Sequence, residues 1–178
     1  MRRTQTLLAW VFAVGVAVAV IGVPGPAPAQ AAESQAGTWT GGGALGFLAN
    51  TPDDTAFALN LDFGYRLNRE LSVGPLVQLG FTGDMTLVGL SGQAKYSLAV
   101  PGTEDRGKLV LQAGLGFVHA DFLQSDTSWL IPLGVGFEFA VDRRLAVTVT
   151  FLLNFTDLDT GGGTGTNVMP GLTFGVRF

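Results

Sequence analysis

Apolar and polar residues alternate along most of this chain, most clearly over its last eleven residues. From Val168 to Phe178 every second residue is apolar, and the residues between them are mostly small, polar or charged. Successive side chains of a β-strand point to opposite faces, so a period of two predicts a strand with one apolar and one polar face. The same alternation, interrupted by turn residues, recurs seven more times upstream. The pattern therefore predicts eight strands.

These strands are expected to form a transmembrane barrel. We place them at residues 39–47, 57–67, 71–82, 88–98, 108–117, 129–139, 145–155 and 168–178. Most have the roughly 9–11 residues that a tilted strand needs to cross an outer membrane. The Leu, Val and Phe face must leave water, and the Gly, Thr and Gln face must avoid hydrocarbon. The prediction is an all-β, eight-stranded, antiparallel up-and-down transmembrane β-barrel.

The interior of this barrel is expected to be a packed polar core. Eight strands leave a lumen just wide enough for side chains to fill, and the 26 glycines make room for long polar ones. Six charged residues occupy inward positions: Asp62, Arg66, Lys95, Lys108, Glu138 and Arg177. Unpaired buried charges are costly, so we expect Asp62 and Glu138 to pair with Lys or Arg neighbours. The favoured interpretation is a static network that plugs the lumen, and the alternative is a switchable gate in a narrow pore.

The N-terminal segment has the features of a cleavable signal peptide. Arg2 and Arg3 precede an apolar stretch over residues 7–23, and a Pro-rich exit with small residues follows. We expect residues 1–31 to be removed, which leaves residues 32–178 as the barrel domain; the alternative is a permanent anchor. Removing two arginines changes the net charge from −4 to −6, because all 14 acidic residues lie downstream. Such a chain is not expected to bind nucleic acid.

Together, the signal peptide, the eight alternating strands and the terminal Phe178 resemble the small eight-stranded bacterial outer-membrane β-barrel family, which includes OmpX and the OmpA barrel domain. The resemblance covers residues 32–178. It implies a place in the outer membrane of a Gram-negative envelope, in contact with lipid and lipopolysaccharide. It also implies that the barrel assembly machinery reads the last strand, with Phe178 as its signal. Trp39, Trp129, Tyr65 and Tyr96 are expected to form aromatic girdles at the membrane interfaces.

Two features were considered as catalytic or metal sites. His119 is the only histidine, but position 121 is Asp, so the His-x-Ser spacing of a lipid A deacylase is missing. A histidine at the lipid interface is the favoured interpretation. Asp157 and Asp159 superficially resemble a calcium loop, but Gly161 and Val168 stand where further ligands would be needed. We predict no cofactor, no metal site and no catalytic residue.

The predicted connections differ in charge. Those at the end opposite the termini carry Asp53, Asp54, Asp84, Asp121, Asp126, Asp157 and Asp159 and no Lys or Arg, whereas the other end carries Arg69, Arg106, Arg143 and Arg144. We expect the aspartate end to face outward, where divalent cations could bridge it to lipopolysaccharide phosphates. The sequence thus favours an outer-membrane barrel with a structural or interaction role. The alternatives are a narrow pore, a lipid A-modifying enzyme and a soluble lipocalin-like binder with an apolar cavity.

Overall fold

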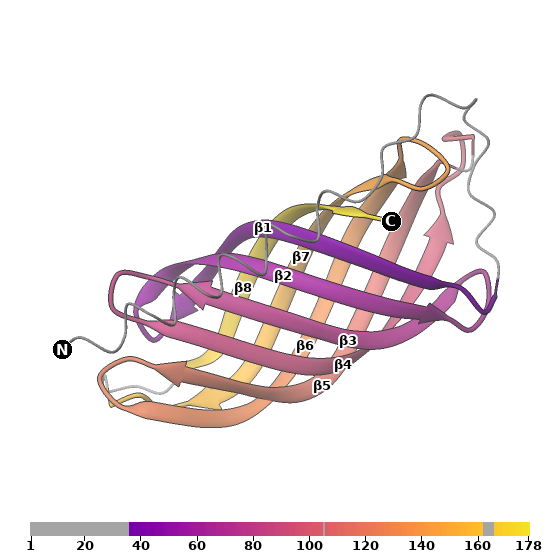
Figure 1. The fold of residues 1–178 in the computed structure, drawn as a ribbon. Coiled ribbons are helices and arrows are strands. Elements are labelled where there is room, and N and C mark those ends of the chain that lie inside the picture. Colours follow the sequence, from indigo (N-terminus) through magenta and orange to yellow (C-terminus); the bar gives the residue numbers. More distant parts are fainter. Residues whose placement is uncertain (1–35, 105, 162–165) are drawn as a thin grey trace.

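The chain forms one closed antiparallel barrel of eight strands in sequence order (Figure 1). This computed structural model describes residues 36–104, 106–161 and 166–178, so the predicted signal peptide lies outside the described residues. The strands are β1 (Trp39–Thr51), β2 (Asp54–Arg66), β3 (Leu71–Phe81), β4 (Thr86–Ala99), β5 (Gly107–Asp121), β6 (Ser125–Ala140), β7 (Ala146–Leu158) and β8 (Thr166–Arg177). The predicted barrel and the number and order of its strands are confirmed.

The two ends of the barrel are distinct, and we name them for what they hold. The terminal end carries Phe178 and the start of β1, which the backbone hydrogen bond from Gly37 N to Arg66 O fixes beside β2. The opposite end, called the distal end, carries the short turns that join β1 to β2, β3 to β4 and β5 to β6 (Figure 1). Among the described residues, no helix is long and apolar enough to cross a membrane.

Several strands extend further toward the distal end than predicted. The first strand continues from the predicted limit at residue 47 to Thr51, β5 continues to Asp121, and β6 begins at Ser125 rather than at residue 129. Polar residues interrupt the apolar alternation at this end, but the backbone ladder does not depend on side chains and continues. The sequence pattern therefore predicts strands that are too short at the distal end, where apolar residues no longer alternate with polar ones.

The closing seam between β1 and β8 depends on glycine. Its ladder runs from Gly42 opposite Arg177 to Leu48 opposite Gly171, and Gly41 and Phe178 exchange two backbone hydrogen bonds of 2.8 Å. A Cβ on Gly46 would lie only 1.9 Å from the carbonyl oxygen of Leu172. Only glycine permits this close approach of backbones. The Gly-rich composition of β1 is therefore a requirement of barrel closure.

The outward faces follow the predicted alternation. The side chain of Leu115 is 68% exposed on the barrel surface, whereas that of Leu130, an inward residue of the neighbouring strand, is 1% exposed. Trp39 and Tyr65 pack together near the terminal end with ring centroids 5.2 Å apart, and Trp129 is exposed toward the distal end. A continuous apolar belt with aromatic residues toward both rims is the surface that a lipid-embedded barrel requires.

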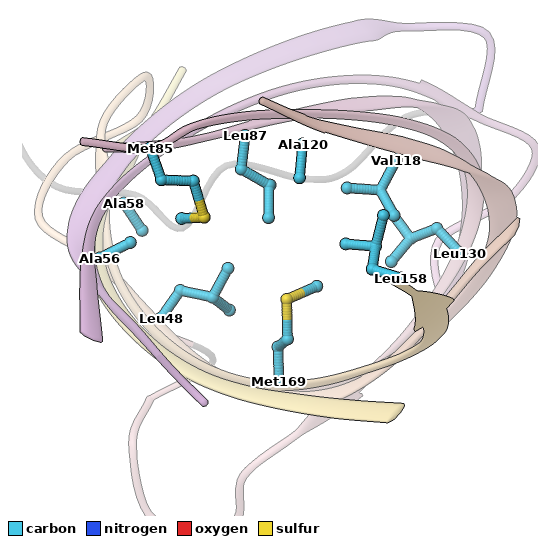
Figure 2. Packing of buried hydrophobic residues seen from close by; sticks show 10 residues of the cluster. All are labelled: Leu48, Ala56, Ala58, Met85, Leu87, Val118, Ala120, Leu130, Leu158 and Met169. Atoms are coloured by element: carbon cyan, nitrogen blue, oxygen red, sulfur yellow. The ribbon is translucent and has the colours of Figure 1, made fainter. Parts of the chain in front are cut away.

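The prediction of a polar core is wrong for the distal half of the interior. Ten apolar residues fill this half, and we call them the distal apolar cluster: Leu48, Ala56, Ala58, Met85, Leu87, Val118, Ala120, Leu130, Leu158 and Met169. Figure 2 shows their side chains pointing inward from around the barrel wall. Most of them lie beyond the predicted strand ends, where the sequence pattern assigned no face. The charged side chains of the lumen lie in the terminal half.

Candidate functional site

The terminal half contains a charge network of four side chains, one from each even-numbered strand. The Lys95 Nζ lies 2.8 Å from the Asp62 Oδ2, and Arg177 contacts two carboxylates, the Asp62 Oδ2 at 3.1 Å and the Glu138 Oε2 at 2.7 Å. The four side chains are between 10% and 19% exposed. Because each carboxylate accepts charge-assisted hydrogen bonds, the cost of removing these groups from water is offset.

Strand register and one glycine bring this network together. Both Asp62 on β2 and Arg177 on β8 are ladder partners of Gly42 on the intervening strand β1. A Cβ at Gly42 would lie 2.6 Å from the Asp62 Oδ1. The missing side chain thus leaves the space in which the carboxylate and the guanidinium meet. A larger residue at this position would push the two groups apart.

The other two predicted lumen charges lie near the same end. Lys108 on β5 is the ladder partner of Glu138 on β6. Arg66 lies at the last position of β2, half buried at the terminal mouth. Within residues 36–104, 106–161 and 166–178, no hydrogen bond or ion pair engages the Arg66 guanidinium. The pairing expected for Asp62 and Glu138 is therefore present, and Arg66 stands outside it.

Three small cavities follow one another along the lumen. The cavity at the terminal mouth measures about 10 Å³, and the next, about 30 Å³, shares Glu138 and Arg177 with it. The innermost measures about 10 Å³, shares Asn60 and Thr173 with the second, and reaches Leu87 of the distal apolar cluster. A volume of about 10–15 Å³ accommodates one water molecule. The terminal half thus has room for single waters, in series, up to the apolar cluster.

The middle of the lumen is polar but poorly satisfied by the protein. Buried side-chain atoms of Gln78, Gln93, Ser91 and Asn154 have no hydrogen-bond partner among the described residues. Gln78 and Asn154 line the innermost cavity. Buried polar groups almost always hydrogen bond to protein or water, so these amides are suited to bind water in the cavity beside them. The middle of the lumen is therefore polar, whereas the neighbouring distal apolar cluster is not.

At the distal end the turns are tied to one another. The hydroxyl of Thr82, between β3 and β4, bonds the Asp53 carboxylate in the turn between β1 and β2. On the other side, Gln124 N donates to the Thr160 carbonyl at 3.1 Å, which joins the last two distal connections. The sequence does not indicate these contacts, because they join turns that are distant in the chain. They hold the distal turns together above the apolar cluster.

The remaining candidate residues do not form a recognisable catalytic or metal site. The His119 Nδ1 lies 2.7 Å from the Thr127 Oγ1, its cross-strand neighbour on β6. Ser125 donates its hydroxyl hydrogen to the Asp121 carboxylate instead. In the part of the chain that the structure describes, no group of three His, Cys, Asp or Glu could hold a metal ion. The lipid A deacylase alternative gains no geometric support, since His119 bonds a threonine.

Comparison with known proteins identifies the family. Residues 15–178 match the outer membrane protein beta-barrel domain, so the chain belongs to this family. It is a bacterial outer-membrane protein, and its barrel is the transmembrane domain that the sequence predicts. No curated protein matches the chain.

Several solved structures share the fold. Neisserial surface protein A (NspA) superposes with a TM-score of 0.61 and 19% identity, over 78% of this chain and 94% of that one. The N-terminal β-barrel domain of Pseudomonas aeruginosa OprF gives a TM-score of 0.52 and 14% identity, over 78% and 97%. The outer membrane enzyme PagL gives 0.49 and 12%, over 78% and 98%, a similarity too low to bear on catalysis.

Proposed function

We propose that the protein is a non-conducting outer-membrane barrel with a structural or interaction role and without catalysis. The observation that supports this proposal is the distal apolar cluster. Its ten side chains are buried and point into the lumen from around the barrel wall (Figure 2). Phe122 packs against them. An ion entering such a segment would lose its hydration without finding a polar partner, which costs far more than thermal energy. The cluster is therefore a barrier to ions and polar solutes.

The charge network supports a closed lumen from the other end. Asp62, Glu138 and Arg177 are held by contacts of 2.7–3.1 Å, so no side chain in the network is free to swing without breaking an ion pair. Of the three cavities described above, the widest measures about 30 Å³, which is smaller than a hydrated ion needs. We therefore favour a static network over a switchable gate, and both halves of the lumen act as a plug.

Conductance in planar lipid bilayers tests this proposal. We expect the wild-type protein to give no discrete current steps. A Leu87→Ser/Leu130→Ser/Arg177→Ser triple variant, which introduces polar groups into the distal apolar cluster and breaks the charge network, should conduct. Leu115→Ser is the matched control, because this leucine faces outward and should leave the lumen closed. Steady currents through the wild-type protein would contradict the proposal and favour the narrow pore.

We further propose that the distal end faces the cell exterior and contacts lipopolysaccharide, and that the terminal end faces the periplasm. The negative charge of the aspartates at the distal end supports this orientation. Some of these aspartates also accept hydrogen bonds within the protein; Asp126, for example, accepts one from Asp159 N. Asp84→Asn and Asp157→Asn variants should bind lipopolysaccharide less strongly than the wild type when Ca²⁺ is present. Identical binding by variants and wild type, with and without Ca²⁺, would contradict this contact.

The last residue is the proposed signal for the barrel assembly machinery. The Phe178 side chain is 57% exposed and its ring lies against Gly41, so it marks the seam where β8 meets β1. A Phe178→Ala variant should lower the fraction of protein that shows a heat-sensitive gel shift in cells. Unaltered assembly in cells would contradict this role.

A further inference from the structure

The cavity at the terminal mouth, which we call the vestibule, is lined by an excess of positive charge. Four of its described lining residues are cations, Arg66, Arg69, Lys108 and Arg177, and two are carboxylates, Glu70 and Glu138. Glu138 is engaged by Arg177, and Glu70 accepts a hydrogen bond from the Tyr96 hydroxyl on the outer surface. Among the described lining residues, the positive charges therefore exceed the negative charges.

Two arginines that line this cavity have guanidinium donors without a partner among the described residues. Arg66 is half buried, and among the described residues its guanidinium makes no hydrogen bond or ion pair. The Arg177 Nε is fully buried and also lacks a hydrogen-bond partner in the described part of the chain. Arginine donors that are withdrawn from water without an acceptor are unfavourable, and a buried guanidinium normally binds a carboxylate or a phosphate.

The two arginines also lie within electrostatic range of each other. Arg66 is repelled by Arg177 and attracted by Glu138, whose carboxylate Arg177 already holds. An anion beside Arg66 would offset this repulsion and accept the hydrogen bonds that Arg66 does not use. Two like charges on separate strands that line one cavity form a suitable site for an oxyanion.

We propose that the vestibule binds a small oxyanion, a phosphate or carboxylate group, which enters from the side of the chain termini. Arg66 is its principal ligand, and Arg177 contributes its positive charge from the wall of the cavity. The enclosed volume of about 10 Å³ accommodates one oxygen of the ligand, and the rest of the group lies in the open mouth near Arg69 and Lys108. Binding of this kind depends on neither the orientation of the barrel nor its conductance.

Titration with inorganic phosphate tests the proposal. The protein, extracted from membranes in a nonionic detergent, is titrated by calorimetry at constant ionic strength, with chloride as the reference anion. We expect saturable phosphate binding that Arg66→Gln weakens by about tenfold or more, because a charge-assisted bidentate contact is lost. Arg66→Lys should retain part of the affinity, since it keeps the charge but not the planar fork.

Arg144→Gln is the matched control. Arg144 is exposed in the turn between β6 and β7 at the same end, and it does not line the vestibule. The Arg144→Gln substitution removes the same charge as Arg66→Gln and should leave phosphate binding unchanged. Phosphate binding that does not saturate, or that falls equally in Arg66→Gln and Arg144→Gln, would overturn the proposal. A heat-sensitive gel shift for each variant shows that the barrel is folded.

A second set of measurements identifies the source of the phosphate group. The protein is reconstituted in phosphatidylcholine vesicles and in vesicles that also contain phosphatidylglycerol, and its thermal stability is compared. Free phosphate that stabilises the protein in phosphatidylcholine vesicles supports a soluble ligand. Stabilisation that requires phosphatidylglycerol, and that Arg66→Gln abolishes, supports the same site with a lipid headgroup in it. The absence of any Arg66-dependent effect in both vesicle types would count against the site.

Discussion

The two halves of the lumen are built from opposite kinds of side chain, although an apolar belt surrounds the outside of the barrel. Ten apolar residues fill the distal half, whereas four charged side chains meet in the terminal half. The distal half is stabilised by burial and close packing, and the terminal half by charge pairing. The comparison shows that the lipid constrains only the outward face of each strand, so the inward face can differ from one end to the other.

The difference has a direct consequence for water. The three cavities lie in the terminal half and the middle of the lumen, and their series ends at the distal apolar cluster. Polar side chains with unused hydrogen-bonding atoms line that path, whereas the ten side chains of the cluster are apolar and Thr156 is the polar residue beside them with such an atom among the described residues. We therefore describe the lumen as hydrated from the terminal end and dry at the distal end.

The largest effect is expected from breaking the charge network. Asp62→Ala removes the carboxylate shared by Lys95 and Arg177 and leaves two buried cations without that partner. We expect the free energy of unfolding to fall by about 3–5 kcal/mol, as for other buried ion pairs that lose one member. Urea unfolding in lipid vesicles, followed by tryptophan fluorescence, measures this change.

The control for this variant removes both members of a pair. Asp62→Leu combined with Lys95→Met leaves the contact of Arg177 with Glu138 in place, and we expect it to stay within about 1 kcal/mol of the wild type. A loss below about 1 kcal/mol for Asp62→Ala itself would mean that the network behaves like a surface ion pair, and the two halves would not differ as described.

A somewhat smaller effect is expected in the distal apolar cluster. Leu130→Ala removes a fully buried side chain and leaves a cavity, so we expect a loss of about 2–4 kcal/mol in the free energy of unfolding. This loss should be insensitive to salt, because the substitution removes no charge. Leu115→Ala, on the outer face, creates no internal cavity and should cost less. Equal losses for the two leucine variants would show that the distal half is loosely packed.

The smallest effect is expected at the boundary between the halves. Both polar atoms of the Gln93 side chain are buried without a partner among the described residues. Gln93→Leu should therefore be neutral or stabilising by up to about 1 kcal/mol, because it removes two unsatisfied groups at similar volume. Gln112→Leu is a useful comparison, since this residue lines the 30 Å³ cavity. A loss above about 2 kcal/mol for Gln93→Leu would instead indicate a firmly bound water network.

The sequence predicted the strands and the outward faces well, because lipid imposes a strict period of two. It also placed Asp62 and Glu138 inside the barrel with basic partners. It could not choose between those partners: Asp62 lies opposite Leu76 in the ladder with β3, whereas Lys95 lies opposite Ser72, so the pair is diagonal across that strand. Such offsets depend on the stagger of the strands, which alternation does not encode.

The apolar interior of the distal half could not be predicted from the sequence. Leu48, Leu87 and Val118 lie just outside the predicted strands, at positions assigned to no strand, so no inward apolar face was predicted there. Arg66 illustrates a different limit. Arg66 and Asp62 occupy equivalent inward positions in the alternation of β2. Only the structure shows that Asp62 lies within the charge network and that Arg66 lies at the terminal mouth.

Thiol labelling tests most directly whether the lumen is hydrated at one end and dry at the other. The chain contains no cysteine, so single variants report on one position each. Ser97→Cys places a thiol in the vestibule, and Val118→Cys places one in the distal apolar cluster. The folded protein in detergent is treated with a charged thiol reagent. Our account predicts rapid labelling of Ser97→Cys and labelling of Val118→Cys only after unfolding; equal labelling of the two folded variants would contradict it.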